Sequence, residues 1–218
     1  MIYSNITTDI ERALYAISNA TVTNCEFSGP ADGESALKEC RNITVDRCRF
    51  YLRYALWHLQ KGKVSNIYMS EGCRAPLWYD KDVTIADSDM HGIKALRECF
   101  DAEIIDSSII SPEFGWSVKG LKMTNTSAES EYFLMRSSDI VFENVSFKGK
   151  YSFQYVENVE INNCRFDTKD AFWHAKNVTV KDSFIKGEYL AWYSENLTFI
   201  NCTIKGTQPL CYCKGLKL

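Results

Sequence analysis

The chain has 218 residues, 45% of them hydrophobic and 24% charged, and its formal net charge at pH 7 is -3. This composition is typical of a soluble globular chain. The small charge, with basic residues spread along the sequence, argues against nucleic-acid binding, and no apolar run approaches the length of a membrane span.

The N-terminal stretch "MIYSNITTDIERAL" has no positively charged segment followed by an apolar one, so a secretory leader is not indicated. Nine cysteines, an odd number, point to reduced thiols and a cytoplasmic location. Four cysteines share one inward position of the repeat described below, where a thiol packs as a small apolar group: Cys25, Cys48, Cys164 and Cys202. Cys211 and Cys213 form a C-x-C pair without a second pair, so neither a metal site nor a cofactor is predicted.

From residue 11 onward the chain repeats with a period of 19 residues. Each copy is marked by a turn residue, mostly Asn, Asp or Gly, types that tolerate a left-handed backbone. These residues are Asn19, Asn42, Lys61, Asp82, Asp101, Gly120, Asp139, Asn158, Asn177, Asn196 and Gly215. We number each copy from this residue as position 0. The spacing lengthens to 23 around "SGPADGES" and to 21 around "SEGCRAP", which predicts an insertion in each of these copies.

Within each copy, apolar or small residues alternate with polar ones, as at Val178 and Val180, and this is the period of a strand. Positions 1 and 3 predict one strand and positions 6 and 8 a second. A third is expected around position 14, where Leu or Phe recurs. Strands that each bury one face imply stacked coils around a shared core. We therefore predict an all-β fold, a right-handed parallel β-helix of ten to eleven coils, about 50 Å long, with residues 1–10 as an N-terminal cap on a single domain, 11–218.

The sequence ends at "KGLKL", where Leu216 and Leu218 occupy positions 1 and 3 of a last copy. An uncapped solenoid end exposes core residues and strand edges. Unless further coils follow, we expect this end to be able to pair with another molecule and form a homo-oligomer.

The side of the coil around the predicted third strand carries an unusual set of residues. All five tryptophans lie at position 15, which strand alternation turns outward because position 14 is apolar. An exposed strip of Trp and Tyr interleaved with acids, Arg and His suits an elongated polar ligand such as an oligosaccharide. Rings pack on sugar faces, and charged groups bind hydroxyl or acidic groups. The predicted ligand-binding residues are Arg74, Trp78, Arg97, Glu98, Trp116, Arg136, Tyr155, Trp173, Trp192 and Tyr193.

Catalysis on this strip would need paired carboxylates. Asp170 and Glu188 lie on adjacent coils with His174 near them, and Glu113 and Glu131 form a second candidate pair. Such pairs serve as general acid and base in glycoside hydrolysis, whereas a basic residue or Tyr would serve an elimination by a polysaccharide lyase. Solvated charges are also common on a solenoid face, so the sequence leaves open whether the protein is an enzyme.

Several motifs have a familiar form: "LRYALWH", "CRAPLWYDK", "GIKALRE", "GKYSFQYVENV", "TKDAFWH" and "GEYLAWYSENL". They resemble an uncharacterised, mainly bacterial family of pectate-lyase-like right-handed β-helices, a domain of unknown function. The resemblance runs from about Glu11 to the end of the chain. It implies the fold but no activity. Lyases of the wider group use calcium held by clustered acids, and no acidic cluster of this chain matches theirs.

Two functional interpretations follow from the strip. In the first, the protein binds or processes a carbohydrate, and Trp173 and Trp192 should be accessible along a groove with Asp170 and Glu188. In the second, it is a non-enzymatic scaffold that uses the strip or the open end as a protein interface. The rings could also form a ladder that only stabilises the coil.

Overall fold

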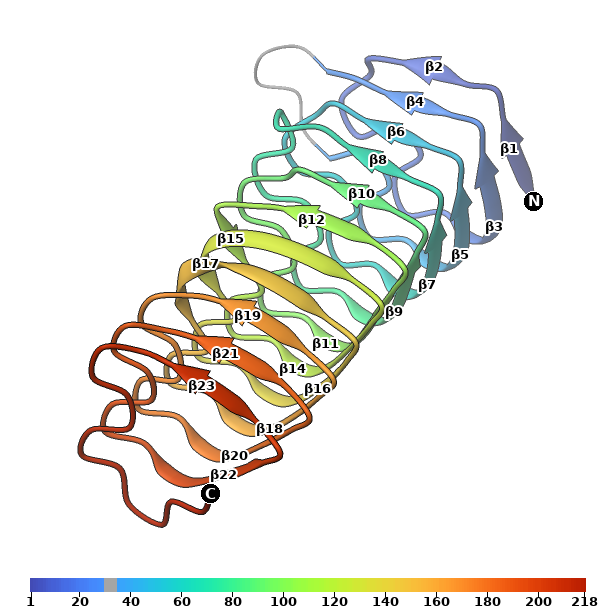
Figure 1. Cartoon of the computed structure of the whole chain (residues 1–218). Helices are drawn as coiled ribbons and strands as arrows, with labels where there is room; N and C mark the ends of the chain where they lie inside the picture. The colour runs from blue at the N-terminus through green and yellow to red at the C-terminus, as the bar shows by residue number, and fades with distance from the viewer. Residues whose placement is uncertain (30–34) are drawn as a thin grey trace.

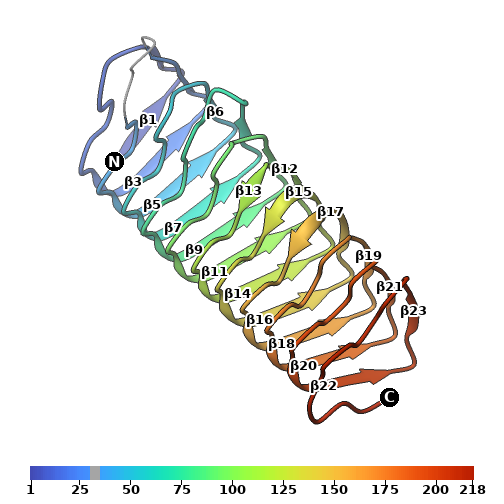
Figure 2. The same ribbon diagram turned by 90° about the vertical axis from the view of Figure 1, so that its left-hand side faces the viewer.

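The computed structural model of the protein describes residues 1–29 and 35–218. These residues form a right-handed parallel β-helix (Figure 1). Each coil contributes one strand to each of two parallel sheets. The coils stack along one axis, so that the two ends of the chain lie at opposite ends of the rod (Figure 2). The predicted fold is confirmed.

The first sheet consists of β1 (Ile2–Ser4), β3 (Ser18–Thr23), β5 (Arg41–Asp46), β7 (Gln60–Ser65), β9 (Lys81–Ala86), β11 (Phe100–Ile105), β14 (Lys119–Thr124), β16 (Ser138–Glu143), β18 (Glu157–Asn162), β20 (Lys176–Lys181) and β22 (Glu195–Ile200). The second sheet consists of β2 (Thr7–Thr8), β4 (Glu26–Phe27), β6 (Arg49–Phe50), β8 (Tyr68–Met69), β10 (Asp89–Met90), β12 (Ser108–Ile110), β15 (Ser127–Phe133), β17 (Ser146–Ser152), β19 (Arg165–Asp167), β21 (Phe184–Lys186) and β23 (Thr203–Lys205). A further strand, β13 (Glu113–Phe114), pairs with β15. The described residues contain no helix with the length and apolar character of a membrane span.

The strand register follows the sequence period. Lys176 pairs with Glu195, 19 residues later, whereas Gln60 pairs with Lys81 because the insertion around "SEGCRAP" lengthens that coil. The predicted insertion around "SGPADGES" falls largely on residues 30–34, which lie outside the described residues. Residues 1–10, for which we expected a cap, contribute β1 and β2, the first strand of each sheet.

The core lies inside the coil and is built from the predicted inward positions. Val178 and Val180 of β20 are fully buried, and the residues on either side of them are not. Phenylalanine rings stack from coil to coil, as in the pair Phe153–Phe172, whose ring centroids are 4.8 Å apart. Burying a side chain of this size contributes about 1.5–3 kcal/mol. Neighbouring coils therefore hold each other together through a continuous apolar column.

The predicted third strand is wrong for most coils. The third side, the chain between a second-sheet strand and the next first-sheet strand, is a tight turn in which positions 14 and 16 have positive φ, as at Leu77 (58°) and Tyr79 (61°). Among the described residues, regular strand occurs there only in β13 and in the last residues of β15 and β17. The N–H of Leu77 bonds to Ala55 O of the preceding coil, and that of Tyr79 bonds to Arg97 O of the following one. These bonds and the full burial of the leucine offset a left-handed backbone that costs about 1–2 kcal/mol per residue.

Candidate functional site

The tryptophan column lies on the third side as predicted, and its rings stack on one another. The ring centroids of Trp57 and Trp78 are 5.2 Å apart with planes 3° from parallel, and those of Trp173 and Trp192 are 5.6 Å apart at 7°. Each stacked pair covers the ring faces that the two members turn toward each other. This arrangement agrees with the interpretation of the column as a stabilising ladder.

Four of the indole N–H groups donate to carbonyl groups of the following coil, whereas Trp116 Nε1 is buried and has no partner among the described residues. Trp173 Nε1 donates to the carbonyl of Tyr189 at 2.5 Å, and Trp192 Nε1 donates to that of Gln208 at 2.8 Å. The same bond to the carbonyl at position 12 of the following coil is made by Trp78, at 2.9 Å. The sequence did not suggest this role, because the bond depends on how the third side turns.

Arg97 takes the place of a tryptophan in this column. Its guanidinium lies between Trp78 and Trp116, 5.1 and 4.5 Å from their ring centroids, and donates to Glu113 at 2.8 Å. Lys94 adds a second contact to Glu113, at 3.6 Å. The planar cation continues the stack, and cation–π contacts of this kind contribute about 0.5–2 kcal/mol.

A second aromatic column, at position 16, is more exposed. Tyr155, His174, Tyr193 and Tyr212 stack with centroid separations of 5.0, 5.3 and 4.8 Å, and Arg136 lies 5.6 Å from the Tyr155 ring. Their outer edges face solvent, with Tyr155 51% and Tyr193 48% exposed. Arg74 and Glu98 are also exposed on this side. The ligand-binding role of this side stays a prediction.

The two predicted carboxylate pairs differ in their surroundings. Glu113 and Glu131 are held by separate cations, since Glu131 pairs with Lys150 at 3.1 Å, and the register sets Glu113 beside Tyr132. Asp170 is buried, and its Oδ1 has no partner among the described residues.

Burial raises the pKa of Asp170, an effect that Lys169 opposes and Glu188 reinforces. His174 stacks in the position 16 column. Glu188 lines a hollow of about 320 Å³ with Lys186 and Lys205, and Trp173 and Trp192 do not line it. This hollow is therefore not the groove that we expected to join Trp173 and Trp192 to Asp170 and Glu188.

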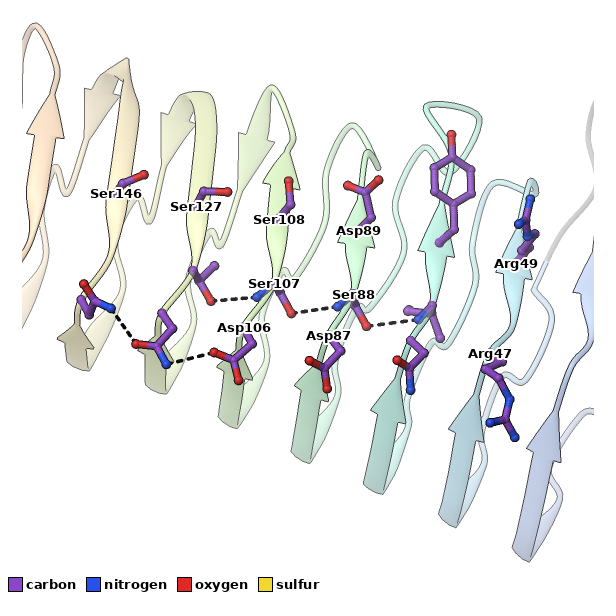
Figure 3. Close-up of a pocket in the computed structure, with 16 residues that line it drawn as sticks. Arg47, Arg49, Asp87, Ser88, Asp89, Asp106, Ser107, Ser108, Ser127 and Ser146 are labelled. Carbon is purple, nitrogen blue, oxygen red and sulfur yellow. Dashed lines mark hydrogen bonds between the residues drawn. The ribbon is translucent and has the colours of Figure 1, made fainter.

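A larger hollow lies elsewhere, where the first-sheet strands turn into the second sheet (Figure 3). We call it the corner groove. It has a volume of about 990 Å³ and runs along the coil axis over several coils. Its lining residues are Arg47, Arg49, Asn66, Ile67, Tyr68, Asp87, Ser88, Asp89, Asp106, Ser107, Ser108, Asn125, Thr126, Ser127, Asn144 and Ser146.

The groove is built by a repeated turn. In most coils Asn or Asp occupies position 5 with positive φ, as at Asp87 (49°) and Asn125 (50°), because these residue types tolerate the left-handed region; Arg47 (50°) is the exception in the groove. The next side chain points inward, and its hydroxyl bonds to the backbone, as Ser107 Oγ does to Ile105 O at 2.7 Å. The residue after that points outward into the groove, as Ser108 and Ser127 do (Figure 3).

Many polar groups of the groove are already paired. Asn144 donates to Asn125 at 2.7 Å, and Asn125 donates to Asp106 at 2.9 Å, so the amides form a ladder along one wall. In contrast, Ser127 and the Asp87 carboxylate make no side-chain hydrogen bond to any other described residue. Their polar atoms remain available to a ligand.

Asp87, Asp89 and Asp106 concentrate negative charge in the middle of the groove. Asp89 Oδ1 contacts His91 Nε2 at 2.9 Å. Arg47, at one end, is paired with Asp46 at 3.0 Å. The middle of the groove therefore disfavours acidic ligands. No cluster of three or more metal-ligating side chains is found within residues 1–29 and 35–218.

Sequence reasoning missed the corner groove. The available signal was a second column of Asn and Asp at position 5 of the repeat, followed two residues later by a serine in three coils, Ser108, Ser127 and Ser146. This signal gives residue types only, and it does not show that the corner between the sheets is hollowed.

The fold is similar to that of known β-helix proteins. PfbA, a surface adhesin of Streptococcus pneumoniae, is 13% identical with a TM-score of 0.52, over 99% of this chain and 70% of that one. The A-module of mannuronan C-5 epimerase AlgE6 from Azotobacter vinelandii is 8% identical with a TM-score of 0.48, over 100% and 88% of the two chains. No functionally curated protein matches the sequence. The family model described as "Protein of unknown function (DUF3737)" matches residues 1–218, and the chain therefore belongs to this family.

Proposed function

We propose that the protein binds an extended neutral oligosaccharide or polysaccharide segment along the corner groove. The observation that carries this proposal is the row of unpaired hydroxyl and carboxylate groups on successive coils, represented by Asp87, Ser108, Ser127 and Ser146. A ligand that presents hydroxyl groups at regular intervals can bond to such a row repeatedly.

The geometry supports a ligand that lies along the axis. Neighbouring coils are about 4.8 Å apart, and the groove extends from the coil of Arg47 to that of Asn144, so its length is about 25 Å. The open, shallow form suits a chain that enters sideways rather than a small molecule that is enclosed.

The charge of the groove selects among sugars. Asp87 and Asp106 accept hydrogen bonds from sugar hydroxyls, and bonds to an ionised acceptor are about twice as strong as neutral ones. The same carboxylates repel uronic acids and sulfated sugars. We therefore expect neutral glycans to bind and acidic ones to bind weakly.

Calorimetric titration of neutral and acidic oligosaccharides against matched variants tests the proposal. Ser127→Tyr fills the groove without straining the strand, since Tyr68 occupies the same column. Ser18→Tyr is the control, on the first sheet in a column that contains the exposed Phe100. We expect a neutral glycan whose affinity falls at least tenfold in Ser127→Tyr and is unchanged in Ser18→Tyr. If both variants bound the glycan with the same affinity as the wild type, the proposal that the corner groove is the binding site would be refuted.

The third side is a second candidate for carbohydrate binding, favoured by the exposed edges of Tyr155 and Tyr193 and by the unpaired buried oxygen of Asp170. Loss of glycan binding in Tyr193→Ala, with Ser127→Tyr unaffected, would support it. If bond cleavage accompanies binding, Asp170 would act as the general acid, and Asp170→Asn would bind the glycan without releasing new reducing ends.

The scaffold interpretation makes a different prediction. If the third side or the end near Leu218 is a protein interface, the chain should self-associate or bind a partner without any glycan. Sedimentation equilibrium of the chain alone would show an oligomer in this case.

A further inference from the structure

Two further hollows adjoin the corner groove on the outer surface of the second sheet. The first, of about 320 Å³, shares Ser127 and Ser146 with the groove. The second, of about 470 Å³, shares Glu129 and Lys148 with the first. Because each hollow shares lining residues with the next, the three lie side by side in a row that starts at the groove and crosses the sheet. We call the two smaller hollows the side arm.

The local sequence explains why the side arm exists at these coils. β15 and β17 run for seven residues, longer than the other strands of the second sheet, so the sheet is widest here. Gly149 of β17 lies at an inward-facing position of the strand, where a Cβ would lie 1.9 Å from Ser130 O and 2.5 Å from the Phe147 ring. Glycine at this position therefore fits the close approach of β15.

The side arm has a different chemistry from the groove. Ile110, which is 49% exposed, and Pro112 give its far part an apolar surface. The ion pair of Glu129 with Lys148, at 3.5 Å, lies between the two hollows, and that of Glu131 with Lys150, at 3.1 Å, borders the far one; both pairs are exposed. Exposed pairs of this kind contribute little to stability, so their charged groups can re-pair with a ligand at little cost.

This combination fits a single sugar unit. A pyranose ring has an apolar C–H face and a rim of hydroxyl groups, and its face would contact Ile110 while its hydroxyls bond to Glu129 and Lys148. A volume of about 470 Å³ lies within the range of about 300–1,000 Å³ that small-ligand sites occupy. The junction at Ser127 and Ser146 marks where such a unit would connect to a chain in the groove.

We propose that the side arm receives a branch of the polysaccharide and that the preferred ligand is a branched neutral glycan. This inference rests on the proposed function of the corner groove. It adds a substrate class, because a linear chain would fill the groove and leave the side arm to solvent.

The test compares linear and branched oligosaccharides with the same backbone. Manno-oligosaccharides and their galactosyl-branched forms are one pair, and cello-oligosaccharides and xyloglucan oligosaccharides are another. Ile110→Glu places a carboxylate in the side arm, and Ile200→Glu is the control at a residue of nearly equal exposure, 48%, on the first sheet.

For the wild type and for Ile200→Glu, we expect the branched member of a pair to bind at least tenfold more tightly, a difference of about 1.4 kcal/mol. In Ile110→Glu this preference should fall below threefold while the linear affinity is unchanged. Equal or weaker binding of the branched member, or an equal loss for both members in Ile110→Glu, would overturn the side arm and leave the groove intact. If no member of either pair binds, the proposed function fails and this inference fails with it.

Discussion

Asp80 is a buried carboxyl group with an incomplete set of partners. It is 1% exposed, its Oδ1 accepts the N–H of Leu59 at 2.8 Å, and its Oδ2 has no partner among the described residues. Burial raises the pKa of Asp80 well above its ordinary value of 3.8, and the bond from Leu59 opposes this only in part. The folded protein therefore favours the protonated form, whereas the unfolded chain ionises more readily, so Asp80 lowers the stability of the fold as the pH rises above 3.8.

The substitution Asp80→Ser should stabilise the protein at pH 8. Serine occupies the same place in two other coils, where Ser137 accepts the N–H of Val118 at 3.0 Å and Ser194 accepts that of Ala175 at 3.1 Å. Serine would keep the bond to Leu59 and remove the carboxyl oxygen that lacks a partner. An unsatisfied buried polar group costs about 1–3 kcal/mol, so we expect a gain of about 1–2 kcal/mol after the loss of some packing.

The dependence on pH gives the sign of the effect. Because the pKa of Asp80 is raised in the folded state, the folded protein binds more protons than the unfolded chain above pH 3.8. The contribution of Asp80 to the free energy of unfolding is therefore fully present below pH 3.8 and is lost as the pH rises through the pKa of Asp80 in the folded state. Urea denaturation of wild type and Asp80→Ser at pH 4, 6 and 8 measures this directly.

The gain in stability should be smallest at pH 4 and largest at pH 8. Asp82→Asn, at an exposed turn residue of the same coil where asparagine is common, should match the wild type at every pH. An Asp80→Ser protein that is less stable than wild type at pH 8, or whose difference from wild type is the same at all three values, would refute the reasoning.

Three further predictions concern packing and cysteine reactivity. Trp173→Phe keeps the ring stack but removes the indole N–H, so urea denaturation should show a loss of about 1–2 kcal/mol, and no loss would mean that the bond is unimportant. Phe172→Ala should cost about 3–5 kcal/mol because its side chain is fully buried, whereas Phe100→Ala, at a residue 48% exposed, should change stability by less than about 0.5 kcal/mol. Equal losses would contradict the assigned core. Burial raises the pKa of Cys48 to about 12, so iodoacetamide at pH 8 should alkylate the partly exposed Cys211 first, as mass spectrometry of the digested protein would show. Earlier labelling of Cys48 would be inconsistent with its burial.

The coiled fold was predictable because it depends on a sequence pattern that recurs many times along the chain. Inward positions such as Val178 and Val180 recur with the strand period, and the spacing of 19 residues sets the register between coils. The third side was predicted as a strand because Leu77 and its equivalents are apolar. The signal against a strand is a second buried residue directly before position 14, as at Ala55 and Leu56, since a strand would turn one of the two outward.

The candidate site was harder to predict. The position of the Trp173 column was correct, but the direction of its N–H depends on where the next coil turns its carbonyl. The corner groove depends on how the two sheets meet, and the types of Asp87 and Ser127 alone do not reveal this. Repetition thus determines the local structure, while the shape of the surface follows from the cross-section of the coil.

The most direct test of the central claim is a crystal structure of the protein with a bound neutral oligosaccharide. We expect the sugar chain to lie along the corner groove, with hydroxyl oxygens about 2.5–3.0 Å from Asp87 and Ser127. A sugar bound instead against Tyr155 and Tyr193 on the third side would contradict the account.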